Sequence, residues 1–202
     1  MSQPKLFAAR MLLLASTLTV GTVHAESDNE TLFSGTTRLA CEALLCLSSS
    51  AGGSIGACSP ALSHYFGIKK RKFSDTLSAR LSFLQQCPVA NQTPAMASLV
   101  QAISQGAGRC DADSLNQVLQ TLKTDRRGRE YLVIGNTPPG YCSAYTGHAY
   151  TDLSATTPKY VGKPEDGGYW VAPSQYESEL IKYQAALEEK RKREQEQHYS
   201  DW

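Results

Sequence analysis

Six cysteines are the residues whose number and spacing point most directly to a chemistry, namely disulfide formation. An even number of cysteines in a chain with an export signal is typical of a disulfide framework, and six cysteines can pair in many ways. Two of them, Cys41 and Cys46, fall on one predicted helix, where a rise of about 1.5 Å per residue separates them by about 7.5 Å along the axis. That separation exceeds the roughly 7 Å that a disulfide spans between Cα atoms, so each needs a partner elsewhere. The full set is Cys41, Cys46, Cys58, Cys87, Cys110 and Cys142.

Other residue types offer little further chemistry. No two of the histidines show the spacing of a metal site, and six paired cysteines leave no thiol for a Cys–His nucleophile. Glu42 is of the type that serves as the acid of a glycan-cleaving enzyme, but no partner carboxylate is identifiable, which favours a solvated helix residue. The sequence therefore predicts no catalytic residue, no cofactor and no metal ligand. The histidines considered are His24, His64, His148 and His198.

The first 25 residues have the pattern of a cleaved secretory signal peptide. Lys5 and Arg10 give a positive start, an apolar run follows, and the segment that ends at Ala25 has the pattern a signal peptidase cleaves. The apolar run is shorter than the roughly 20 residues of a membrane span, so an uncleaved anchor is the weaker alternative. We expect a mature chain that begins near Glu26, lies in the periplasm and has no membrane span.

The charge balance gives no general attraction to nucleic acid. The chain has 20 basic and 19 acidic residues, and the loss of Lys5 and Arg10 with the signal peptide leaves 18 against 19. The run 69–72, KKRK, is a basic loop that can contact phosphates or anionic lipid headgroups. The run 190–193 alternates with glutamates and is typical of a helix face with ion pairs. No nucleic-acid partner is expected.

Hydrophobic periodicity and turn residues predict the elements that position the cysteines. Leu44, Leu45, Leu77, Leu81 and Leu84 are expected to pack together from two of the predicted helices. The predicted elements are helices at 37–48, 59–67, 75–87, 94–104 and 113–123, a β-prone run at 131–134, a turn-rich loop at 135–140, a hairpin of 159–162 with 169–171, and a charged helix at 174–198. On that last helix, residues 176, 180, 183 and 187 form a narrow apolar stripe, so the helix either docks by the stripe or projects into solvent.

These elements predict a mainly α fold: a small disulfide-stapled helical domain with a minor β-hairpin and a charged C-terminal helix. The expected organisation is a signal peptide at 1–25, a flexible leader at 26–36, the disulfide-stapled domain at 37–172 and the charged helix or tail at 173–202.

Several segments of the core, spread over roughly residues 38–172, resemble a known family. Cys41 and Cys46 lie on a leucine-rich stretch, and a glycine-rich gap leads to Cys58 followed by Ser59 and Pro60. A helix then ends at the segment 83–88, FLQQCP, and a later segment at 160–171 reads YVGKPEDGGYWV. Together these segments resemble the TrbM/KikA/MpfK family of conjugal transfer proteins.

The resemblance implies a protein of mating-pair formation, encoded on a plasmid or integrative element and exported beside a type IV secretion machine. It brings no settled catalytic residue. We expect a periplasmic accessory that acts by binding other conjugal transfer proteins, in an oligomeric state that the sequence leaves open. The alternative is a peptidoglycan-cleaving enzyme that opens a path for the transfer channel.

One disulfide pairing follows if the helices at 37–48 and 75–87 are antiparallel neighbours. Cys41 then lies beside Cys87, Cys46 is left for Cys58 across the glycine-rich loop, and Cys110 pairs with Cys142. Either of the alternatives Cys41–Cys58 and Cys46–Cys87 requires a different helix orientation.

The last third of the chain is rich in tyrosine. Tyr160, Tyr169 and Trp170 are candidate interface residues because polar aromatic side chains often anchor protein–protein contacts, while structural tyrosines of a small sheet are at least as good an interpretation.

Overall fold

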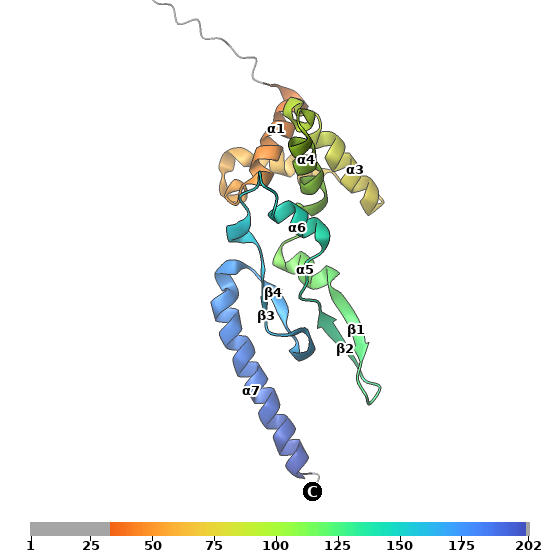
Figure 1. The fold of residues 1–202 in the computed structure, drawn as a ribbon, viewed down its shortest axis with the longest axis vertical. Coiled ribbons are helices and arrows are strands. Elements are labelled where there is room, and N and C mark those ends of the chain that lie inside the picture. The colour runs from red at the N-terminus through yellow and green to blue at the C-terminus, as the bar shows by residue number, and fades with distance from the viewer. Residues whose placement is uncertain (1–32, 201–202) are drawn as a thin grey trace, which may run out of the picture. The chain divides into compact units, whose positions relative to one another are not determined.

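The structure, a computed structural model, describes residues 33–200 and consists of seven helices, short 3₁₀ turns and two pairs of strands within that range (Figure 1). The expected signal peptide at 1–25 and most of the expected leader lie outside the described residues. The main elements are α1 (Gly35–Ser48), α2 (Ser59–Gly67), α3 (Phe73–Leu84), α4 (Pro94–Gly106), α5 (Ala112–Val118), β1 (Gln120–Thr124), β2 (Glu130–Ile134), α6 (Gly140–Thr146), β3 (Lys159–Val161), β4 (Tyr169–Val171) and α7 (Tyr176–Ser200).

The main apolar core lies among α1, α2, α3, α4 and α6, and small residues line much of the α1 surface that faces it. Ala40 and Ala43 are fully buried, beside Leu44 and Leu47. Small side chains let neighbouring helices approach closely, and α1 packs against both α2 and α3. Ile103 of α4 is fully buried in the same cluster, so the core is continuous from the first helix to the fourth.

Local signals explain where α4 and α5 begin. Thr93 precedes α4, its side chain accepts a hydrogen bond from the Met96 backbone nitrogen at 3.1 Å, and Pro94 occupies the first turn. Asp111 precedes α5 and accepts a hydrogen bond from the Ser114 nitrogen at 2.9 Å. Both helices therefore begin at a side-chain cap that the sequence supplies.

Three disulfides join the elements. Cys41 bonds to Cys87, with the Cα atoms 4.9 Å apart, and ties α1 to the segment that follows α3. Cys46 bonds to Cys58 across the glycine-rich turn, at a Cα separation of 5.8 Å. Cys110 bonds to Cys142, at 5.5 Å, and ties the α4–α5 connection to α6. These are the three pairs expected from antiparallel α1 and α3.

The strands form two separate antiparallel pairs. In the β1–β2 pair, Leu122 lies opposite Leu132, and in the β3–β4 pair, Tyr160 lies opposite Trp170. No third strand joins either pair within the described part of the chain. The predicted hairpin of 159–162 with 169–171 is confirmed, and so is the β-prone run at 131–134.

One predicted element is wrong. The helix expected at 113–123 ends at Val118, and the chain continues as β1 because residues 120–124 pair with β2 along their whole length. The turn-rich loop predicted at 135–140 is confirmed as far as Pro139. The short helix α6, which carries Cys142 and begins at Gly140, is not among the elements predicted from the sequence.

The predicted leucine cluster is partly wrong. Leu44 and Leu84 are buried in the core, and the half-buried Leu81 packs against it. Leu77 is half-buried outside the core cluster, and Leu45 is 71% exposed. Phe83 takes a core position instead. Leu45 is exposed because Ala40, Ala43, Leu44 and Leu47 define the buried face of α1, and residue 45 falls beside that face.

The charged helix α7 docks by its stripe. Tyr176, Leu180, Tyr183 and Leu187 are half-buried while the residues around them are mostly exposed, and α7 contacts β3. Among the described residues, no helix combines the length and the apolar character that crossing a membrane requires.

Candidate interaction surface

The candidate interface residues of the β3–β4 hairpin are partly used within the chain. Trp170 is 6% exposed, its indole nitrogen donates to the Gly135 carbonyl at 2.9 Å, and its ring meets Tyr160 edge-on with centroids 5.2 Å apart. The Tyr160 hydroxyl donates to the Ile134 carbonyl at 2.7 Å. These bonds hold β3–β4 against the end of β2 and leave Trp170 little surface for a partner. An interface role for the group stays a prediction.

Asn116 of α5 fixes β4 from the other side. Its amide nitrogen donates to the Trp170 carbonyl at 2.8 Å, and its amide oxygen accepts from the Trp170 backbone nitrogen at 2.7 Å. One side chain therefore occupies both backbone groups of a residue 54 positions away. Sequence reasoning missed Asn116, since a polar residue on a short helix carries no signal of such a partner.

Tyr169, the third candidate, faces α7. Its hydroxyl donates to Glu179 at 2.9 Å, and Lys182 donates to the same carboxylate at 2.7 Å. The hydrogen bonds from Lys182 and Tyr169 lower the pKa of Glu179, while burial and the bond to Glu179 raise the pKa of Tyr169. Tyr183 packs its ring against Gly162, whose φ of 78° and lack of a Cβ permit this approach.

The residues considered for catalysis lie apart and have structural contacts. Glu42 receives a hydrogen bond from Arg38 at 2.6 Å on the surface of α1. His64 stacks on Phe83 with ring centroids 4.7 Å apart, and the His148 ring nitrogen accepts from the Tyr150 backbone nitrogen at 3.1 Å. The described residues contain no group of three or more side chains able to hold a metal ion. Glu42 and the two histidines are therefore not assembled into one site.

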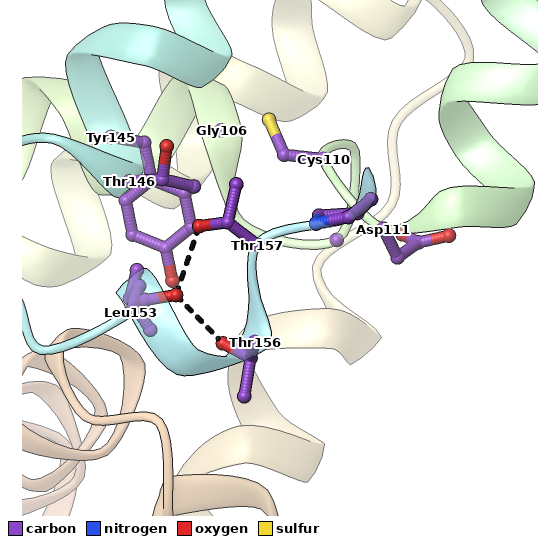
Figure 2. A pocket seen from close by; sticks show the side chains of 10 residues that line it. Gly106, Cys110, Asp111, Tyr145, Thr146, Leu153, Thr156 and Thr157 are labelled. Carbon is purple, nitrogen blue, oxygen red and sulfur yellow. Dashed lines mark hydrogen bonds between the residues drawn. The ribbon is translucent and has the colours of Figure 1, made fainter. Parts of the chain in front are cut away.

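A hollow of about 250 Å³ lies beside α6 and the following 3₁₀ turn (Figure 2). The hydroxyls of Thr156 and Thr157 both donate to the Leu153 carbonyl, at 3.1 and 2.9 Å, as the dashed lines in Figure 2 show. The Tyr145 hydroxyl donates to the Leu47 carbonyl, and burial raises the pKa of Tyr145. The tyrosine and threonine hydroxyls that line this hollow already support the fold, and the Asp111 carboxylate beside them accepts two hydrogen bonds from Ser114.

Arginine and aromatic side chains meet on another face. The Arg109 guanidinium carbon lies 3.8 Å from the Tyr141 ring centroid and 4.9 Å from that of Phe73. Arg80 of α3 lies 4.9 Å from the ring centroid of Tyr65, whose pKa burial raises to about 12 against the opposing effect of the Arg80 charge. Both guanidinium groups therefore lie against aromatic rings, and neither forms an ion pair within residues 33–200.

The features of this chain define a disulfide-stapled, mainly helical domain with exposed apolar and basic surface. The chain belongs to the TrbM family, whose family model matches residues 32–184, and it is therefore a protein related to conjugal transfer. No curated protein and no solved structure matches it.

Proposed function

We propose that this protein is an exported, periplasmic accessory of mating-pair formation, associated with a type IV secretion machine, that acts by binding other conjugal transfer proteins. Its family supplies the link to conjugal transfer. Three disulfides and no free cysteine in the described residues fit an oxidising compartment such as the periplasm. The residues of the expected signal peptide support the same location.

The exposed apolar face of the β1–β2 hairpin carries the proposal of a binding role. Leu122 and Leu132 lie directly opposite each other and are 59% and 60% exposed. An isolated two-stranded hairpin is marginally stable in water, and cross-strand leucines on an open face gain little from the folded monomer. Such a face gains apolar burial when a partner protein covers it.

The test replaces Leu122 and Leu132 together by serine in donor cells that carry the whole transfer region. A partner that covers this face buries both leucines. Losing them, at about 1.5 kcal/mol each, should weaken partner binding roughly a hundredfold. We expect transfer frequency and the recovery of transfer proteins with the purified chain to fall together. Thr121→Ser and Lys123→Ser, on the other face of β1, form the matched control and should leave both measurements near wild type.

Two results would contradict a binding role. One is wild-type transfer and partner recovery for the leucine variant when its thermal unfolding shows an intact fold. The other is clearing of a peptidoglycan gel by the purified mature protein, which would support the cell-wall-cleaving alternative.

A further inference from the structure

Six cations around α3 have no ion-pair partner among the described residues. Four are the exposed run at 69–72 between α2 and α3, and the others are Arg80 and Arg109. The ion pairs within 33–200 involve other residues: Arg38 with Glu42, Arg129 with Asp125, Lys182 with Glu179, and Arg193 with Glu189. A basic group without counter-charges leaves a positive potential at its surface.

Contacts show that these cations belong to one surface, which we call the basic–aromatic surface: residues 66, 69–73, 80, 109, 118 and 141. Arg80 lies 5.5 Å from the Phe66 ring centroid, and Phe66 packs against Gly108, where an added Cβ would come within 2.8 Å of the ring. Arg109 follows Gly108 and stacks on Phe73, which follows the basic run directly. The contacts are therefore continuous from Arg80 through Phe66, Gly108, Arg109 and Phe73 to the basic run at 69–72.

Arg80 is the most constrained of these cations. It is 8% exposed, and its Nε atom is buried without a hydrogen-bond partner. The faces of Tyr65 and Phe66 offset part of the cost of burying this charge, but no carboxylate within residues 33–200 does. A carboxylate brought to the surface above α3 would meet a positive charge that the fold itself leaves uncompensated.

A hollow of about 400 Å³ on this surface offers a place for an apolar side chain. Phe73, Val118 and Tyr141 line it together with Arg109. Phe73 and Val118 are 54% and 53% exposed, a high value for side chains of this kind. Two ring contacts and a hydrogen bond from Nη1 to the Gln105 carbonyl at 2.7 Å hold the planar Arg109 guanidinium in place. The edge formed by Nε and Nη2 is left for bidentate binding of a carboxylate.

Three acidic residues lie in the same stretch of chain and do not cancel the charge. Between residues 66 and 118 they are Asp75, Asp111 and Asp113, against the six cations. Asp111 is occupied at the start of α5, where its carboxylate accepts from the nitrogen and the hydroxyl of Ser114 at 2.9 and 2.8 Å. The surface as a whole therefore remains positive.

We infer that the basic–aromatic surface binds an acidic segment of a transfer-protein partner, which places an apolar or aromatic side chain in the hollow and carboxylates against Arg109 and the 69–72 run. Charge complementarity selects the acidic partner, and the hollow favours a protruding side chain over a flat lipid surface. The inference rests on the proposed binding role and names the chemistry of one partner.

The experiment places the photo-crosslinking amino acid p-benzoylphenylalanine at position 118 of the exported full-length chain, in donor cells that carry the whole transfer region. Ile181, 68% exposed on α7, is the control position. We expect an adduct with a transfer protein at position 118 and not at 181, mapped by mass spectrometry to a segment of net negative charge. Its yield should fall about tenfold when Arg71 and Lys72 become glutamine, because two attractive charges are lost.

A matched charge control changes Lys190 and Arg193 of α7 to glutamine and should leave the adduct yield unchanged. Arg109→Lys, which keeps the charge but not the planar group, should lower the yield less than Arg71→Gln with Lys72→Gln. Both loop residues are exposed, so their loss should leave the unfolding temperature unchanged and separates binding from folding.

Several outcomes would overturn the inference. They are an adduct with lipid, with DNA or with a neutral or basic protein segment, a yield insensitive to the loop charges, and equal yield at position 181. No adduct at 118 while the leucine variant of the β1–β2 hairpin still lowers transfer would overturn this inference and leave the proposed function standing. Normal transfer for both sets of variants would remove the proposed function as well.

Discussion

The helical core and the β3–β4 region differ in what reinforces their apolar packing. In the core, fully buried side chains such as Tyr65, Leu84 and Ile103 pack between helices that disulfides also join. In the β3–β4 region, Val161, Trp170 and Val171 are buried too, and the side chains of Asn116 and Trp170 add hydrogen bonds to backbone groups. The comparison indicates that covalent links reinforce the core, whereas hydrogen bonds from a few side chains reinforce the β3–β4 region.

The largest expected effect is loss of the disulfide that closes the longest loop. Replacing Cys41 and Cys87 by serine opens a loop with a sequence separation of 46 and should lower the free energy of unfolding by about 4 kcal/mol, in the chain-entropy account. Replacing Cys46 and Cys58, at a separation of 12, should cost about 3 kcal/mol. Urea unfolding of both variants measures the difference, and a larger loss for the shorter loop would show that strain or packing outweighs entropy.

A second prediction concerns alkaline pH. The pKa of Tyr65 in the folded chain is about 12, above its ordinary value of about 10, so the fold disfavours the ionised phenol. The stability that Tyr65 contributes is complete below its unfolded pKa and is lost as the pH rises toward its folded pKa, by about 2–3 kcal/mol for a shift of about two units. Urea unfolding at about pH 9 and about pH 11 should show about half of this loss, roughly 1.4 kcal/mol, and Tyr65→Phe should reduce it.

Tyr169→Phe provides the comparison from the β3–β4 region. Burial raises the pKa of Tyr169 too, but this side chain is only half-buried. Tyr169→Phe should therefore reduce the loss of stability at alkaline pH less than Tyr65→Phe does. Equal reductions would contradict the view that the two regions differ in how strongly they exclude charge.

The smallest expected effect tests the polar clamp. Asn116→Ala leaves the Trp170 nitrogen and carbonyl without partners and should cost about 1–2 kcal/mol. The loss should appear as faster amide hydrogen exchange in β3 and β4, with exchange in α1 and α4 unchanged. Gln117→Ala, one position along on the exposed side of α5, is the control. Faster exchange throughout the chain would show that the two regions unfold as one unit.

The sequence predicted the parts of this fold whose signals are local. Pro94 after Thr93 marks the start of α4, and the two β-prone runs on either side of the loop at 163–168 mark a hairpin. The disulfide pairing was accessible because the spacing of Cys41 and Cys46 on one helix, combined with an antiparallel neighbour, leaves few arrangements.

The parts that sequence reasoning missed depend on tertiary contacts. Leucine content suggested that Leu45 is buried, but alanines define the face of α1 that packs against α2. Leu119 and Leu122 have the spacing of a helix, but pairing of residues 120–124 with β2 ends that helix at Val118. The basic–aromatic surface arises from residues 66 to 141 along the chain, so no single sequence window displays it.

The order of the cysteines has a consequence for the way the chain matures. The Cys46–Cys58 bridge is nested inside the Cys41–Cys87 bridge. A chain that crosses a membrane from its N-terminus delivers Cys41, Cys46 and Cys58 to the oxidising side before Cys87 arrives. Cys41 can then react with Cys58 too early, and such a premature bond is resolved only by thiol–disulfide exchange. An exported chain of this design therefore gains from a disulfide isomerase in the compartment where it folds, and should accumulate misbridged forms in donor cells that lack one.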